Sequence, residues 1–183
     1  MKLVILDRDG VINEDSDHFV RTLAQWKPLP GAIEAIARLS RAGYDVYVAT
    51  NQSGVGRGLI PPGELEAMHR RMVQLVEEQG GRLAGIYYCP HVPEDGCGCR
   101  KPKPGLLDRI RADAGVAELT GVPLVGDSLR DLEAAAARGC RPILVRTGKG
   151  RAAEAALHES PHLAGVAVYD DLAAAAQALL TGP

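Results

Sequence analysis

The regular alternation of short apolar runs with longer amphipathic stretches restricts the fold of this chain more than any other feature. Short apolar runs predict buried strands, and the stretches between them predict helices. Their alternation predicts a parallel sheet with helices on both faces, a doubly wound α/β fold. We expect strands at residues 2–6, 45–49, 85–89, 123–126, 142–145 and 166–169. We expect helices at residues 31–41, 62–79, 105–114, 129–138, 152–158 and 172–180.

The size and charge of the chain narrow its organisation and its partners. Its 183 residues, 46% of them hydrophobic, suit a single domain over residues 1–183, and no repeat or linker divides them. A formal net charge of −2 gives no sign of the basic face of a nucleic-acid-binding protein. The N-terminal apolar run is too short for a signal peptide, and no stretch approaches a membrane span. We therefore expect a cytoplasmic protein with neither nucleic-acid nor membrane partners.

Polar residues follow three of the predicted strands at the points where these strands end. Asp7 and Asp9 follow the first strand, Thr50 the second and Asp127 the fourth. Because ligands of such sheets bind outside the carboxyl ends of the strands, we expect these side chains to meet at one edge. The sequence therefore predicts a site for phosphate chemistry at this edge.

The segment LDRDG carries two carboxyl groups suited to phosphoryl transfer. Asp7 is expected to attack phosphorus, and Asp9 to protonate the leaving oxygen and later to activate water. A Mg²⁺ ion would offset the repulsion between these carboxylates and a phosphate, and we expect Asp7, Asp9 and Asp127 to bind it, with Asp131 in support. The alternatives are a strand-end turn for Asp7 and Asp9 and an ordinary helix cap for Asp127.

Two further segments carry groups that suit an anionic substrate. In ATNQSGVGRG, hydroxyl and amide groups are available to phosphate oxygens from Thr50, Asn51, Gln52 and Ser53. Arg57 in the same segment could reach an anionic substrate, and Lys101 in RKPKPG would neutralise the nucleophile and phosphate. The alternatives are a flexible glycine loop for the first segment and a solvated basic loop for the second.

A cluster of thiols and one imidazole predicts a zinc site. Cys89, His91, Cys97 and Cys99 supply the four ligands that tetrahedral Zn²⁺ prefers, and they leave no position for water, which predicts a structural metal. The loop at residues 89–101 is too polar to bury a core, so the metal would supply its order. The alternative is three reduced thiols beside a chance histidine. Cys140 is expected to be a plain buried thiol.

These segments together resemble the haloacid dehalogenase-like phosphatase superfamily, whose motif order matches Asp7/Asp9, Thr50, Lys101 and Asp127. Within it, LDRDGVIN, ATNQSGVGRG, IYYCPHVPEDGCGCRKPKPG and VGDSLRDLEAA are similar to the D-glycero-D-manno-heptose 1,7-bisphosphate 7-phosphatase family. Histidinol-phosphate phosphatases share most of these motifs. The resemblance covers residues 2–150 and implies a Mg²⁺-dependent phosphatase with a Rossmann-like fold and a Zn²⁺ loop between the second and third motifs.

The resemblance also implies which residues contact a sugar bisphosphate. These substrate residues are Asp15, Ser16, Asp17, His18, Thr50, Asn51, Gln52, Ser53, Arg100 and Lys101. The chain departs from some relatives in its short zinc loop and in Ser128, where they carry lysine. Arg146 and Lys149 either meet a second phosphate or lie in a solvated loop. The remaining histidines are expected at the surface or as caps: His69, His158 and His162.

The number of residues between the motifs limits which segments can cover the site. The gaps from Asp7 to Thr50 and from Thr50 to Lys101 are too short for a cap domain. We expect the loop after Asp9, including Trp26, and the zinc loop to exclude water, and we expect a monomer. The hypothesis is hydrolysis of the 7-phosphate of a heptose bisphosphate. The alternatives are a histidinol-phosphate phosphatase and a non-enzymatic zinc-stabilised interaction module, and the five motif residues argue against the latter.

Overall fold

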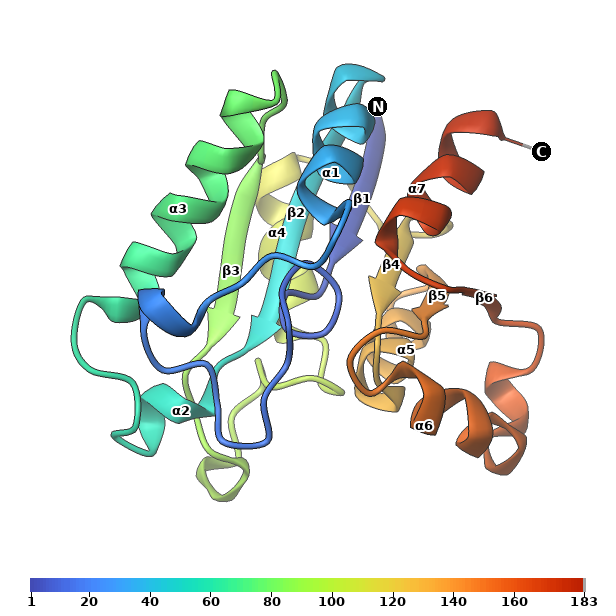
Figure 1. Ribbon diagram of the computed structural model, residues 1–183. Helices are drawn as coiled ribbons and strands as arrows, with labels where there is room; N and C mark the ends of the chain where they lie inside the picture. The colour runs from blue at the N-terminus through green and yellow to red at the C-terminus, as the bar shows by residue number, and fades with distance from the viewer. Residues whose placement is uncertain (183) are drawn as a thin grey trace.

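The computed structural model describes residues 1–182 and contains one six-stranded sheet, in which every neighbouring pair of strands is parallel (Figure 1). The strand order is β3-β2-β1-β4-β5-β6, so the sequence of strands reverses its direction between β1 and β4. The strands are β1 (Lys2–Leu6), β2 (Tyr44–Asn51), β3 (Gly85–Cys89), β4 (Pro123–Gly126), β5 (Arg141–Val145) and β6 (Ala167–Tyr169). The predicted doubly wound α/β fold is confirmed.

Seven α-helices lie along residues 1–182, with four short 3₁₀ turns. The helices are α1 (Ala32–Arg41), α2 (Ser53–Gly56), α3 (Glu64–Glu78), α4 (Gly105–Ala114), α5 (Leu129–Ala137), α6 (Gly150–Ala156) and α7 (Leu172–Thr181). The 3₁₀ turns are η1 (Leu23–Gln25), η2 (Pro93–Asp95), η3 (Leu157–Glu159) and η4 (Pro161–Leu163). Helix α2 and the 3₁₀ turns were not predicted. Helix α3 begins two residues later than expected, because Gly63 precedes it with a left-handed φ of 85°.

Alternate residues of the strands point to opposite faces of the sheet and build separate cores. Val4 and Leu6 pack with α1, α3 and α7, whereas Leu3 and Ile5 pack with α4 and α5 on the other face. Figure 1 shows α1 and α3 on the near face and α4 behind the sheet. Burial on both faces explains why these strands read as nearly continuous apolar runs.

The burial of Trp26 and of Cys140 tests two expectations from the sequence. Trp26 is 6% exposed and belongs to the core under α1 and α3, so it does not cover the site as predicted. Its ring packs with the other apolar side chains of that core. Cys140 is a buried thiol, as expected. Within residues 1–182, no helix combines the length and apolar character needed to cross a membrane.

Candidate active site and zinc loop

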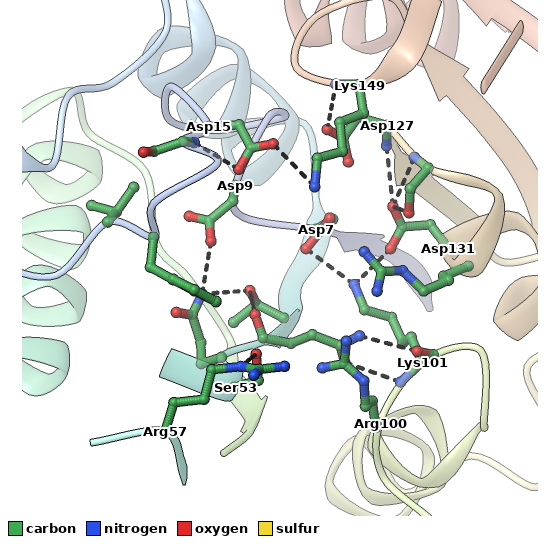
Figure 2. Close-up of a pocket in the computed structure, with 18 residues that line it drawn as sticks. Asp7, Asp9, Asp15, Ser53, Arg57, Arg100, Lys101, Asp127, Asp131 and Lys149 are labelled. Carbon is green, nitrogen blue, oxygen red and sulfur yellow. Dashed lines mark hydrogen bonds and ion pairs between the residues drawn. The ribbon is translucent and has the colours of Figure 1, made fainter. Parts of the chain in front are cut away.

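A pocket of about 250 Å³ opens at the carboxyl ends of β1, β2 and β4, beside the point where the strand order reverses (Figure 2). Its lining includes most of the residues predicted from sequence: Asp7, Asp9, Asp15, Ser16, Thr50, Asn51, Gln52, Ser53, Arg100, Lys101 and Asp127. Asp17 and His18 do not line it, and border neighbouring depressions instead. The sheet therefore brings together motifs that are far apart in the sequence.

Lys101 joins two carboxylates at the floor of the pocket. Its Nζ lies 3.0 Å from Asp7 Oδ1 and 2.6 Å from Asp131 Oδ1, and it donates to the Ala49 carbonyl at 2.6 Å. Burial would lower the pKa of this lysine, but the charges of Asp131 and Asp7 outweigh burial and raise the pKa. Lys101 is 2% exposed, so it is not the solvated basic residue of the alternative interpretation.

Asp7 is a buried carboxylate whose surroundings disfavour its charged form. Burial raises its pKa well above the usual value, and repulsion from Asp131 adds to the effect, while Lys101 opposes it. Asp7 Oδ1 accepts a hydrogen bond from the Arg8 amide at 2.7 Å. No protein group within residues 1–182 donates a hydrogen bond to Oδ2, so this oxygen is available to a metal ion or to phosphorus.

Asp131 fixes the turn between β4 and α5. Its Oδ2 accepts hydrogen bonds from the amides of Asp127 and Ser128, both at 3.1 Å, and from Ser128 Oγ at 2.9 Å. With Oδ1 held by Lys101, both of its oxygens are occupied. Asp131 therefore orders the backbone at Asp127 without presenting a free oxygen to the pocket.

Asp127 is held in place by close backbone contacts. Its Oδ2 accepts a hydrogen bond from the Lys149 amide at 2.9 Å. A Cβ on Gly10 or Gly148 would lie 2.0 or 2.2 Å from this oxygen, and both glycines have left-handed φ angles. Only glycine fits such a close approach. Burial, with Asp131 nearby, raises the pKa of Asp127 to about 7, and a bound cation would favour its charged form.

Three carboxylates meet at this edge, and two of them, Asp7 and Asp127, have an oxygen that could hold a cation. Oxygens of Asp7, Asp127 and Asp131 lie within 4.8 Å of one another. Oxygen ligands of this kind suit Mg²⁺, and the free oxygen of Asp7 beside Asp127 fits the ion. The Asp9 carboxylate, which the sequence analysis assigned to the metal, is not part of this group. Its oxygens accept hydrogen bonds from Arg8, Asn13 and Gln52.

The two oxygens of Asp9 have different surroundings. Oδ1 accepts hydrogen bonds from Arg8 Nε at 3.0 Å, Arg8 Nη2 at 2.7 Å and Asn13 Nδ2 at 2.9 Å. Oδ2 accepts only from Gln52 Nε2, at 3.0 Å. Burial would raise the pKa of Asp9, but Arg8 and these hydrogen bonds lower it. Oδ2 is therefore the less occupied oxygen of a carboxylate that lines the pocket.

The residues at the end of β2 and just after it hold other side chains of the site or line the pocket. Asn51 Nδ2 donates to the Lys101 carbonyl and Asn51 Oδ1 accepts from the Lys101 amide, both at 3.0 Å. Asn51 thus clamps the backbone that carries Lys101. Gln52 Nε2 connects Asp9 with Thr50 Oγ1, to which it donates at 2.9 Å. Figure 2 shows Ser53 and Arg57 at the opposite side of the pocket from Asp127.

Several pocket residues lie beyond the substrate set assigned from sequence. Phe19 has a left-handed φ of 66°, and it lines the pocket together with Val20. Arg130 also reaches the pocket, as the second residue of α5 and one residue before Asp131. Its position in the GDSLRD segment was a usable signal. Phe19 and Val20 gave no signal in the sequence, because the conformation of the loop after Asp9 decides whether they reach the pocket.

Arg146 and Lys149 have different environments, which resolves the question that the sequence left open. Arg146 pairs with Glu154 at 2.8 Å and with Asp170 at 2.7 Å, and it does not line the pocket. Lys149 does line the pocket, and its Nζ lies 3.8 Å from Asp15 Oδ2. Only Lys149 of this pair is available to an anion in the pocket.

The histidines also separate into two groups. His158 and His162 are exposed, as expected, and His162 Nε2 lies 2.8 Å from Glu133. His69 is half-buried on α3, where it borders a surface depression, and its Nε2 lies 3.1 Å from Arg8 Nη1. The sequence analysis missed this contact because α3 and the loop after β1 are far apart in the chain.

The zinc loop brings its four predicted ligands together. Cys89 Sγ lies 3.5 Å from His91 Nδ1 and 3.6 Å from Cys97 Sγ, while Cys99 Sγ lies 3.3 Å from His91 Nδ1 and 3.6 Å from Cys97 Sγ. A tetrahedral Zn²⁺ with ordinary bond lengths needs ligand separations of about 3.5–3.8 Å. The four atoms therefore have nearly the spacing of a zinc tetrahedron, and Arg100 and Lys101 follow the last ligand directly.

We expect Cys97→Ser to abolish zinc binding, because the remaining three ligands leave the tetrahedron open and hydroxyl groups bind zinc poorly. Metal content of the purified protein and limited proteolysis of the loop at residues 89–101 would measure the effect. Cys140→Ser is the matched control, since Cys140 lies outside the cluster and its variant should keep zinc. A Cys97→Ser protein with wild-type zinc content would contradict the assignment.

Taken together, the parallel sheet, the Asp7/Asp9 pair and the Lys101–Asp131 network define the haloacid dehalogenase-like class of hydrolases. A family model described as HAD-hydrolase-like matches residues 98–175. The chain is 58% identical to the D-glycero-β-D-manno-heptose-1,7-bisphosphate 7-phosphatase of Pseudomonas aeruginosa over 97% of both chains. It is 55% identical to the enzyme of the same name from Pseudomonas putida, over 98% of this chain and 100% of the relative. The chain belongs to this phosphatase family.

Solved structures agree with this assignment. The crystal structure of D,D-heptose 1,7-bisphosphate phosphatase from Bordetella bronchiseptica, complexed with magnesium and phosphate, matches with a TM-score of 0.92 and 51% identity over 99% of both chains. The corresponding enzyme from Burkholderia thailandensis matches with a TM-score of 0.73 and 41% identity over the full length of both chains. The family resemblance expected from the motifs is confirmed.

Proposed function

We propose that this protein removes the 7-phosphate of D-glycero-β-D-manno-heptose 1,7-bisphosphate in a Mg²⁺-dependent reaction. The observation that carries the proposal is the pocket in which Asp7 presents a free oxygen beside Lys101 and Asp127. The names of the relatives, which match almost the whole chain, support the substrate. The assigned roles follow from the contacts of each side chain.

In the first step, Asp7 Oδ2 attacks phosphorus and forms an aspartyl-phosphate. The bond from phosphorus to the sugar oxygen breaks, and that oxygen takes a proton from Asp9 Oδ2. The ion pairs with Asp7 and Asp131 keep Lys101 protonated, and its positive charge offsets negative charge on the phosphoryl oxygens. Mg²⁺, when bound at Asp7 and Asp127, would supply further neutralisation of the phosphate.

In the second step, Asp9 acts in the opposite direction. Its carboxylate takes a proton from a water molecule, which attacks phosphorus and releases Asp7 together with inorganic phosphate. We infer that Thr50, which lines the pocket, contacts the phosphoryl group, while Gln52 donates a hydrogen bond to Asp9 Oδ2. Each proton given to the sugar in the first step is thus recovered in the second.

The charge of the outer pocket favours a substrate with two phosphates. Beyond Lys101, the lining carries four cationic side chains, Arg57, Arg100, Arg130 and Lys149. Burial lowers the pKa of Arg100, and the nearby charges of Arg130 and Arg57 lower it further. Guanidinium groups that repel one another in this way form a site for an anion. We propose that Arg57, Arg100 and Arg130 bind the phosphate that is not hydrolysed.

Histidinol phosphate is the second candidate substrate, because the catalytic half of the pocket would serve any phosphate monoester. It has a single phosphate and a cationic amine, so it leaves the three arginines without an anionic partner. Repulsion between its amine and these side chains is expected to weaken binding. The outer pocket therefore favours the heptose bisphosphate.

The deciding experiment compares kcat/KM for heptose 1,7-bisphosphate and histidinol phosphate, by phosphate release with Mg²⁺. We expect at least a roughly 100-fold preference for the heptose, since two to three charge-assisted contacts separate the substrates. Arg130→Gln should reduce this preference by raising KM for the bisphosphate alone. A preference for histidinol phosphate would overturn the substrate, and release from neither would favour a binding role.

We further propose a structural Zn²⁺ in the loop at residues 89–101 and a monomeric, cytoplasmic protein that acts on a small sugar bisphosphate. The spacing of the four zinc ligands supports the metal. A thiol-rich zinc site suits a reducing compartment, which supports the location. The crystal structure with magnesium and phosphate from Bordetella bronchiseptica supports Mg²⁺ as the second metal.

A further inference from the structure

The side chain of Arg8 is fully buried directly behind Asp9, although its neighbours in the chain are the two catalytic aspartates. Its Nε and Nη2 both donate to Asp9 Oδ1, and its Nη1 contacts Nε2 of His69 on α3 at 3.1 Å. Every guanidinium nitrogen of Arg8 therefore has a partner. A buried arginine needs such partners, because an unpaired charge in the interior is costly.

His69 must act as the acceptor in its contact with Arg8. A guanidinium group has donors only, so Nε2 carries the lone pair and His69 is neutral with its proton on Nδ1. Burial, with the charge of Arg8 in addition, lowers the pKa of His69 to about 3, so this state persists at ordinary pH. The imidazole ring is also held beside the ring of Tyr88, at 5.9 Å between centroids.

The orientation of Arg8 toward Asp9 is not the one that an arginine ordinarily adopts with a carboxylate. The preferred pairing is a fork in which two N–H groups reach the two carboxylate oxygens. Here both N–H groups reach Oδ1, and Oδ2 is left to Gln52 and the pocket. The third nitrogen is committed to His69, which prevents the guanidinium from turning to the forked arrangement.

We propose that Arg8 and His69 are positioning residues for the acid/base, and that His69 keeps Asp9 Oδ2 free to carry the proton. This inference rests on the proposed function, since it needs Asp9 to protonate a leaving oxygen. Without the acceptor at position 69, Arg8 turns toward both oxygens of Asp9. Oδ2 then no longer delivers its proton efficiently to the sugar oxygen.

The test uses the dependence of acid catalysis on the leaving group. An alkoxide such as the sugar oxygen needs a proton to leave, whereas p-nitrophenolate leaves without one. We expect His69→Leu to slow single-turnover phosphoryl transfer from heptose bisphosphate by about tenfold or more, a part of what general acid catalysis provides. Transfer from p-nitrophenyl phosphate should slow by less than about threefold under the same conditions.

Two variants control for folding and for the acceptor. His69→Gln keeps an acceptor oxygen for Arg8 and should stay within about threefold of the wild type on both substrates. His158→Leu makes the same change at an exposed histidine and should leave both rates unchanged. Thermal unfolding of all the variants would show whether any loss comes from a smaller folded fraction.

An equal loss on both substrates in His69→Leu, or no loss on either, would overturn the positioning role while leaving the proposed function intact. A selective loss on the heptose substrate in His69→Leu, restored in His69→Gln, would support it. A wild-type protein that releases no phosphate from either substrate would overturn both proposals together.

Discussion

Replacing Asp7 by asparagine should reduce phosphate release from heptose bisphosphate by roughly 10⁴-fold or more, because the carboxylate that attacks phosphorus is lost. The amide keeps the shape of the side chain but is not a nucleophile. Steady-state phosphate release in the presence of Mg²⁺ measures the loss. Rapid acid quenching with radiolabelled substrate should trap a phosphorylated protein from the wild type and none from Asp7→Asn.

The same variant should be at least as stable as the wild type in the absence of metal. Burial and repulsion from Asp131 raise the pKa of Asp7, so removing this charge relieves an unfavourable interaction. Activity and stability are therefore expected to change in opposite directions. Asp45→Asn, at an aspartate paired with Arg82 near the start of β2, serves as a control with wild-type activity. Activity of Asp7→Asn within tenfold of the wild type would rule out the covalent mechanism.

The sheet and the catalytic edge were accessible from the sequence for a physical reason. Strands buried on both faces read as apolar runs, and the chain must expose polar residues where each run ends. Asp7, Thr50 and Asp127 mark those ends, so the fold class and the pocket follow from one pattern. The cluster of three cysteines and His91 was equally accessible, because all four residues lie within one short segment and need no tertiary information.

Other parts of the site depend on contacts that no local pattern encodes. The role of His69 arises only when α3 packs beside the loop that carries Arg8. The sequence left Arg146 open between a second phosphate and a solvated loop, whereas it pairs with Glu154 and Asp170. The left-handed turn at Phe19 exposes Phe19 itself to the pocket and leaves His18 outside it. In each case, the contact or the backbone conformation that decides where the side chain lies could not be predicted from the sequence.

Lys101→Met should affect both stability and activity, because Lys101 is the only cation that contacts Asp7 and Asp131 in the described part of the chain. Its removal leaves two buried carboxylates without a counter-charge, and breaking a buried pair in this way costs about 3–5 kcal/mol of unfolding free energy. We expect kcat/KM to fall roughly 100- to 1000-fold, since a cation beside the phosphoryl oxygens is lost. Lys27→Met, at an exposed lysine, is the matched control.

The pH dependence of this variant distinguishes the loss of charge from a simple packing defect. Without Lys101, repulsion and burial raise the folded-state pKa of the two carboxyl groups above the unfolded value. The folded variant then binds more protons than the unfolded chain, so its stability rises as the pH falls. The gap in unfolding free energy between Lys101→Met and the wild type should therefore narrow between pH 8 and pH 5, as roughly one proton is taken up. Denaturant unfolding at several pH values measures this gap. A gap that stays constant over this range would show that Lys101 contributes through packing and not through its charge.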